Sequence, residues 1–198
     1  MMIRLSQTLF DRWRSFCLTA RGVAFMFTWA VAEAIFFPIV PDYLLMPMAV
    51  AGHARFWRIF FAAAGGSALG VALMYLFAYG MPSAASAFLN QLPVIFPFML
   101  TNANALLDAQ GLTAFWIQPW SGVSYKVFAV LGAAREMNPF VVIPIAIIAR
   151  AARMLIVSAV PAFFAARFER VVRDYWLIFF AGYALLAAYV WVQTQLRG

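Results

Sequence analysis

Five charged side chains lie inside stretches of the sequence that are otherwise apolar. Two are acids, Glu33 and Asp42, and three are bases, Lys126, Arg150 and Arg153. A charge at the centre of a bilayer costs about 2.5–3.5 kcal/mol on insertion scales, so these residues are expected to pair with one another or to line water. Arg150 and Arg153 are three positions apart and would share one face of a helix.

The composition indicates that lipid is the solvent for most of this chain. Of its 198 residues, 66% are hydrophobic and 11% are charged, and the mean hydropathy is +0.88. That leaves too few polar residues to coat a water-soluble globule. Fourteen basic residues stand against seven acidic ones, but the arginines cluster in short gaps between apolar runs, which is typical of membrane flanks and not of nucleic-acid binding. A single cysteine and a single histidine argue against a metal cluster, so we predict neither metal nor cofactor.

Two of the apolar segments carry helix-breaking residues and are predicted to form re-entrant helical hairpins. As one helix, residues 22–51 would be about 45 Å long, which exceeds the roughly 30 Å hydrocarbon core. Residues 112–134 are also interrupted, so two half-helices are expected there. The predicted break points are Pro38, Pro41 and Pro47 in the first hairpin, and Pro119 and Gly122 in the second.

The rest of the chain is predicted to contain one interfacial amphipathic helix, at residues 1–21, and three transmembrane helices. Residues 81–111 contain no lysine or arginine and are expected to be an external connection. The predicted fold class is therefore an all-α integral membrane protein with a single membrane domain over residues 22–198. The three transmembrane helices are expected at 59–80, 137–166 and 175–193.

The distribution of basic residues predicts a cytoplasmic N-terminus. If both interrupted segments are hairpins, nine arginines fall on the cytoplasmic side; if only one is a full crossing, basic clusters fall on opposite sides. Two hairpins or two full crossings fit the charges, and the prolines favour hairpins. Two units that each consist of a hairpin and a span make an inverted repeat, whose ligand site usually lies where broken helices meet near the midplane. The nine arginines are Arg4, Arg12, Arg14, Arg21, Arg55, Arg58, Arg167, Arg170 and Arg173.

The positions of the five buried charges favour binding of an anion over purely structural pairing. Both groups lie beside helix breaks, where freed backbone amides and helix N-termini can face an anionic ligand. Lys126, Arg150 and Arg153 would bind the headgroup, and Glu33 and Asp42 would carry the coupling proton. The alternative is a non-transporting structural or envelope-maintenance protein whose buried charges are ion pairs that hold the fold together.

Three stretches resemble motifs of the DedA family of membrane proteins, also known as VTT-domain (SNARE-associated) proteins. The stretch EAIFFPIVPDYLLMP, residues 33–47, is similar to the first re-entrant motif of that family, which has an acid, a Pro-x-x-Pro and a second acid. The stretch SGVSYKVF, residues 121–128, resembles a motif of the YqaA-like branch, as does Arg150-Ala-Ala-Arg153. Gly122 and Ser124 stand where that branch has prolines. The resemblance covers residues 22–165.

The resemblance implies two facing re-entrant loops and a role in moving lipids across a bilayer. Bacterial relatives are linked to undecaprenyl phosphate or to phospholipids, with proton or sodium dependence. By matching position, Glu33 and Asp42 would take the acidic roles and Lys126 the basic role of the second loop. The expected function is thus a flippase for a phosphate-bearing lipid in a bacterial inner membrane. Its partners would be membrane lipids and the coupling ion, and a homo-oligomer is compatible with these features.

No enzymatic activity is predicted. The stretch Gly122-Val123-Ser124 also matches the G-x-S of intramembrane serine proteases, which need a histidine base within reach of the serine. The one histidine, His53, is expected at the cytoplasmic surface instead. A lipid phosphatase would need a second histidine as well.

Overall fold

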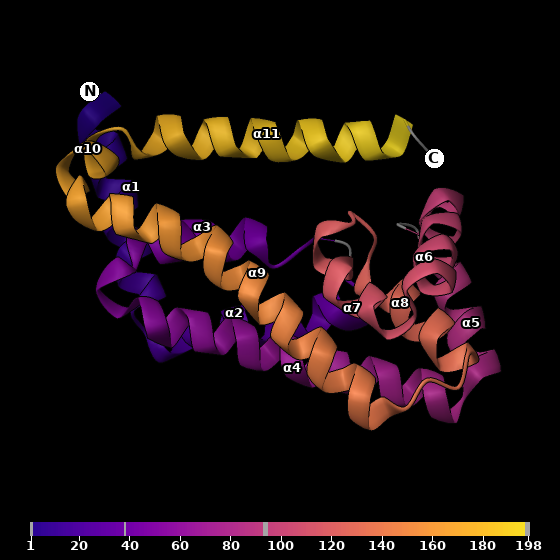
Figure 1. The fold of residues 1–198 in the computed structure, drawn as a ribbon. Helices are drawn as coiled ribbons and strands as arrows, with labels where there is room; N and C mark the ends of the chain where they lie inside the picture. Colours follow the sequence, from indigo (N-terminus) through magenta and orange to yellow (C-terminus); the bar gives the residue numbers. More distant parts are fainter. Residues whose placement is uncertain (1, 38, 93–94, 197–198) are drawn as a thin grey trace. The chain divides into compact units, whose positions relative to one another are not determined.

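The computed structural model describes residues 2–37, 39–92 and 95–196, and its regular elements there are α-helices and short 3₁₀ turns (Figure 1). No β-strand occurs within these residues. The prediction of an all-α fold is therefore confirmed for the described part of the chain.

Two helices are long and apolar enough to cross a bilayer. One is α4 (Phe56–Gly80) with the 3₁₀ turn before it, and the other is α9 (Pro139–Arg167). Helices α1 (Met2–Cys17) and α2 (Ala20–Ile35) meet at a bend of 77° and would together supply a third. These helices are compatible with an integral membrane protein, and α4 and α9 match the spans predicted at 59–80 and 137–166. The span predicted at 175–193 falls on α11 (Trp176–Leu196) and stays a prediction.

The chain folds into two compact units, and each unit is assembled from segments that are distant in the sequence. Helices α2, α4 and α9 each contribute one part to each unit. The units do not coincide with the two predicted repeats, and the inverted repeat stays a prediction. Unit 1 comprises residues 1–27, 40–63 and 154–198, and unit 2 comprises residues 28–39 and 64–153.

Unit 2 is organised around α8 (Tyr125–Ala134), of whose 10 residues all but Leu131 and Ala134 are buried. A short helix that is buried on nearly all sides belongs inside a packed core. It packs against α5 (Pro82–Gln91) and α6 (Pro97–Gln110). Residues 81–111, predicted only as a connection, are thus largely folded into helices that contribute Leu89, Ala103 and Leu107 to the core of this unit.

Helices α2 and α4 approach each other closely at Gly70, within unit 2. A Cβ atom at this position would lie 2.6 Å from the Cβ of Ala34 and 2.9 Å from the carbonyl oxygen of Val31. We expect Gly70→Ala to lower the free energy of unfolding by about 1–2 kcal/mol, because α2 would have to shift. Gly80→Ala, at the end of the same helix, meets nothing within 4 Å and should not destabilise. Thermal unfolding in detergent micelles measures both; equal stabilities would contradict the close contact.

Unit 1 is held together around α1. This helix packs on α3 (Asp42–Ala51), on α10 (Glu169–Asp174) and on α11. The hydroxyl of Ser6 donates to the carbonyl of Arg173 at 3.0 Å, and the amide of Gln7 donates to the carboxylate of Asp174 at 2.8 Å. Arg14 forms an ion pair with Glu169. The N-terminal helix is thereby tied to the C-terminal part of unit 1, and its interfacial position stays a prediction.

The prolines predicted to break the first hairpin differ in whether the helix is interrupted at them. Helix α2 ends at Ile35, and Pro41 directly precedes α3, so the chain leaves helical structure between them. Pro47 lies inside α3, which continues past it, and its prediction as a break is wrong. A proline removes one backbone N–H, and this helix tolerates the loss. Pro38 lies outside the described residues.

In the second predicted hairpin, α7 (Ala114–Ile117) is followed by a 3₁₀ turn over Gln118–Trp120 that contains Pro119. Gly122 then adopts a φ of +73°, a conformation that suits glycine. The chain is non-helical from Ser121 to Ser124 before α8 begins. An interruption between α7 and α8 is therefore present, whereas the re-entrant course of either segment stays a prediction.

Candidate functional site

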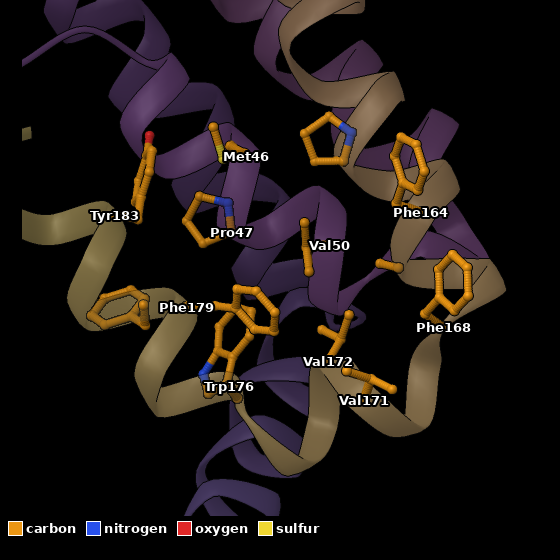
Figure 2. Close-up of a pocket in the computed structure, with 13 residues that line it drawn as sticks. Met46, Pro47, Val50, Phe164, Phe168, Val171, Val172, Trp176, Phe179 and Tyr183 are labelled. Atoms are coloured by element: carbon orange, nitrogen blue, oxygen red, sulfur yellow. The ribbon is translucent and has the colours of Figure 1, made fainter. Parts of the chain in front are cut away.

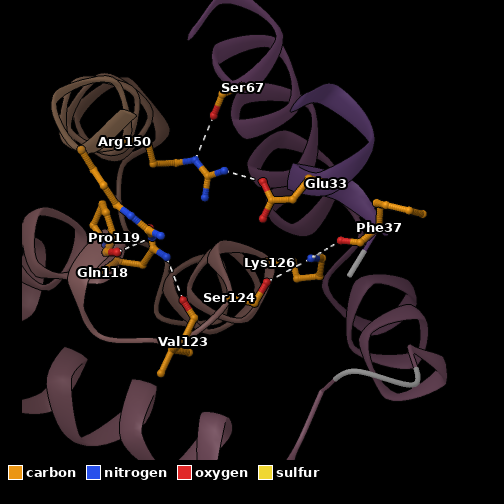
Figure 3. A network of polar contacts seen from close by, with 10 residues as sticks. Glu33, Phe37, Ser67, Gln118, Pro119, Val123, Ser124, Lys126 and Arg150 are labelled. Atoms are coloured by element: carbon orange, nitrogen blue, oxygen red, sulfur yellow. Dashed lines mark hydrogen bonds and ion pairs between the residues drawn. The ribbon is translucent and has the colours of Figure 1, made fainter. Parts of the chain in front are cut away.

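A buried ion pair between Glu33 and Arg150 forms the centre of the polar network in unit 2 (Figure 3). Glu33 comes from the last turn of α2 and Arg150 from the middle of α9, and their side-chain atoms approach to 2.5 Å. The residues are only 5% and 7% exposed. The guanidinium also donates through Nε to the hydroxyl of Ser67 on α4, at 2.9 Å. Three helices therefore supply one network.

Tyr125 gives Arg150 a second support. The guanidinium carbon lies 5.6 Å from the centroid of the Tyr125 ring, a cation–π contact. The hydroxyl of Tyr125 donates to the carbonyl of Val71 at 3.2 Å, which fixes the ring against α4. Sequence reasoning missed Ser67 and Tyr125, because a serine and a tyrosine within apolar segments give no signal of a polar role.

Lys126 is the most buried charge of the network, with 2% of its surface exposed. Its ammonium donates to the carbonyl of Phe37 at 3.3 Å and to the hydroxyl of Ser124 at 3.0 Å. Phe37 follows the end of α2, where backbone carbonyls carry partial negative charge and favour a cation. Both acceptors are neutral, and among the described residues no carboxylate lies within ion-pair distance of Lys126.

The formal charges of this network do not cancel. Glu33 contributes one negative charge, and Arg150 and Lys126 contribute one positive charge each, so the three together carry +1. Glu33 is already engaged with Arg150. A buried positive charge whose hydrogen-bond acceptors are all neutral oxygens, in a network with one carboxylate for two bases, is an electrostatic environment that attracts an anion.

The loop before α8 is held in shape by its own side chains. The amide of Gln118 donates to the carbonyl of Val123 at 2.8 Å, and the hydroxyl of Ser121 donates to the carbonyl of Gln118 at 2.8 Å. From α9, Arg153 donates to the carbonyl of Pro119 at 2.5 Å. Within unit 2, Arg153 therefore contacts the interruption before α8, whereas Arg150 contacts the end of α2.

No protein-family model matches this chain, and no solved structure matches it. An uncharacterized protein of Haemophilus influenzae is 23% identical to it over 171 residues, which covers 86% of this chain and 88% of that protein. The similarity extends along most of both chains, and the name of that protein describes no function. The resemblance to the DedA family therefore stays a prediction.

The structure assigns the five predicted site residues to two units. Glu33, Lys126, Arg150 and Arg153 belong to unit 2, where the first three contribute to the network described above. Asp42 belongs to unit 1, where it begins α3 and its backbone carbonyl accepts a hydrogen bond from the hydroxyl of Tyr183 at 3.1 Å. The described residues contain no group of three or more His, Cys, Asp or Glu side chains that could hold a metal ion.

The hydrogen bond from Arg150 to Ser67 predicts a measurable loss of stability when it is removed. Ser67→Ala leaves the Nε–H of a buried guanidinium without its acceptor, and we expect a loss of about 1–2 kcal/mol in the free energy of unfolding. Ser158→Ala is the matched control, because Ser158 is also buried but its hydroxyl bonds only to the carbonyl of Met154 in its own helix. Chemical unfolding in mixed micelles compares the two. A Ser67→Ala protein as stable as the control would contradict a role for Ser67 in holding Arg150.

Proposed function

We propose that this chain is a membrane transporter that moves a lipid with an anionic, phosphate-bearing headgroup across a bilayer. The observation that carries the proposal is the excess positive charge of the buried network, with Lys126 held only by neutral acceptors. A phosphate headgroup supplies the missing negative charge and accepts several hydrogen bonds. The lipid tails would stay in the hydrocarbon core while the headgroup crosses.

The local backbone supports an anion at the same place. Lys126 lies in the first turn of α8, where backbone N–H groups lack intrahelical partners and the helix dipole is positive. The chain is interrupted before this turn and again after Ile35. Our proposal is that both interruptions are tips of re-entrant hairpins in an inverted repeat, a common arrangement of transporter sites. The proposed membrane is the bacterial inner membrane, with the N-terminus in the cytoplasm.

The Glu33–Arg150 pair supports proton coupling in this proposal. Protonation of Glu33 would end its ion pair, while Ser67 and Tyr125 would still hold the guanidinium. Arg150 would then be available to a phosphate group beside Lys126. Loss of the proton would restore the pair and release the anion. Asp42 is proposed as a second proton carrier, and sodium is the alternative coupling ion.

The proposal is tested in liposomes that contain the purified protein and fluorescent lipids. We expect undecaprenyl phosphate or phosphatidylglycerol to cross at least about tenfold faster than in protein-free liposomes, a barrier reduction of about 1.4 kcal/mol. Phosphatidylcholine, whose headgroup has no net charge, is the control lipid. Glu33→Gln should remove the dependence of the rate on an imposed pH difference. Equal rates for all three lipids, or none above the protein-free rate, would contradict the proposal.

A second candidate function is hydrolysis by a serine–lysine pair. It is favoured by the 3.0 Å distance between the ammonium of Lys126 and the hydroxyl of Ser124, because some hydrolases use lysine as the base for a serine nucleophile. Ser124→Ala separates the two candidates: a hydrolase would lose its activity and its labelling by a fluorophosphonate, whereas a transporter would keep its rate.

The alternative to transport is a structural protein whose buried charges only stabilise the fold. The short Glu33–Arg150 contact favours it, because such a pair joins α2 to α9 within one unit. On this alternative, every change in the network would act on stability alone. The burial of Lys126 argues against it, since this ammonium has no ion-pair partner of its own among the described residues, and such a buried charge weakens a fold.

A further inference from the structure

Unit 1 contains an apolar pocket that the proposed translocation does not use. It has a volume of about 390 Å³ and is formed by α3, the C-terminal part of α9, α10 and α11 (Figure 2). Pro47 and Val50 line it from α3, Phe164 from α9, Val172 from α10 and Phe179 from α11. Its volume lies within the range of small-molecule sites.

Two aromatic residues that line the pocket are held in place by other contacts. The hydroxyl of Tyr183 donates to the backbone carbonyl of Asp42. The indole of Trp176 is 7% exposed and packs edge-on against Phe10, with ring centroids 5.3 Å apart. The pocket therefore offers a wall of aromatic and aliphatic groups, which suits a hydrocarbon chain and not a polar ligand.

Two arginines that form no ion pair with a described residue lie next to pocket-lining residues along the chain. Arg167 is three residues after Phe164 on α9, so the two are neighbours on one helix face, and Arg170 directly precedes the lining residue Val171. Both arginines are exposed, and among the described residues neither forms an ion pair.

The acidic side chains of this end of unit 1 are already engaged. Glu169 pairs with Arg14, and Asp11 pairs with Arg173 at 2.6 Å. Asp174 accepts the hydrogen bond from Gln7, a neutral partner, and keeps its negative charge. Arg167 and Arg170 together outweigh that single charge, so this end of unit 1 keeps a net positive charge, which is complementary to an anionic group.

We propose that this pocket binds one hydrocarbon chain of an anionic membrane lipid, whose phosphate group is held by Arg167 and Arg170. The apolar lining selects the chain, and the arginines select the charge of the headgroup. This site is separate from the network around Lys126, and its occupation does not require that the lipid crosses the membrane. It gives the protein a bound lipid in unit 1.

The test uses the full-length protein in phosphatidylcholine bilayers that contain a trace of phosphatidylglycerol with a photoreactive diazirine in one acyl chain. After irradiation, the labelled peptides are identified by mass spectrometry. We expect labels to concentrate at Phe168, Val172 and Phe179. Phosphatidylcholine with the same diazirine should label these residues much less. Soluble glycerol phosphate should not compete, because it lacks the hydrocarbon chain.

Different variants test the binding of the hydrocarbon chain and the binding of the lipid headgroup. The double variant Arg167→Gln/Arg170→Gln changes exposed residues and should reduce labelling about fivefold for each arginine. Arg58→Gln changes an exposed arginine of unit 1 on α4, a helix that contributes no residue to the pocket, and should leave labelling unchanged. Val172→Trp should exclude the chain by filling the pocket. The proposal is overturned if the double variant labels like the wild type, if phosphatidylcholine labels equally, or if glycerol phosphate competes.

Discussion

Arg150→Met is expected to lower the free energy of unfolding by about 3–5 kcal/mol, because it leaves the carboxylate of Glu33 buried without a counterion. Arg135→Met is the matched control. Arg135 also pairs with a carboxylate, that of Asp108 at 2.6 Å, but the Asp108 side chain is 66% exposed, so its ion pair should contribute no more than about 1 kcal/mol. Unfolding in mixed micelles, followed by circular dichroism, measures both losses.

A double variant tests whether the stability that Arg150→Met loses is due to the unpaired charge of Glu33. Glu33→Gln combined with Arg150→Met removes both members of the pair, and we expect the double variant to recover at least half of the stability that Arg150→Met loses. A glutamine at position 33 keeps the size of the side chain but needs no counterion. If the double variant is as unstable as Arg150→Met alone, the lost stability comes from packing of the arginine and not from the pair.

Lys126→Met should raise the free energy of unfolding, whereas Arg150→Met lowers it. It replaces the most buried charge of unit 2 by an apolar side chain of similar length, which removes an insertion cost of about 2.5–3.5 kcal/mol. The hydrogen bonds to Phe37 and Ser124 are lost, so a net gain in stability of about 2 kcal/mol is expected.

Lys126→Arg is the control for this gain. It keeps the positive charge and should not stabilise the protein. Unfolding midpoints of Lys126→Met, Lys126→Arg and the wild type, measured in the same detergent, show whether removal of the charge stabilises the protein. A Lys126→Met protein that is clearly less stable than the wild type would mean that the ammonium holds the fold together, as the structural alternative requires.

The sequence predicted the helical fold class and the chain segments of the two long spans, because long apolar runs such as those of α4 and α9 leave little choice of structure in lipid. It also predicted that a buried acid would meet a buried base, since unpaired charges are costly there. Glu33 and Arg150 satisfy that expectation. Which base pairs with which acid depends on the packing of α2 against α9, and hydropathy carries no information about it.

Other features depend on tertiary contacts that the sequence pattern does not reveal. Residues 81–111 are interrupted by prolines and carry polar residues such as Asn104 and Asp108, so the sequence predicts a connection there. The structure folds them into α5 and α6, and both polar side chains bond to Arg135 at the end of α8. Pro47 was overestimated as a helix breaker because the remaining hydrogen bonds of α3 are sufficient to continue it.

The initial rate at which Lys126→Met moves undecaprenyl phosphate or phosphatidylglycerol across liposome membranes tests the central claim most directly. Our account predicts that this rate falls to that of protein-free liposomes in a protein at least as stable as the wild type, and that Lys126→Arg keeps a measurable part of it. A folded Lys126→Met protein that moves these lipids at the wild-type rate would show that the excess charge at Lys126 does not serve an anionic headgroup.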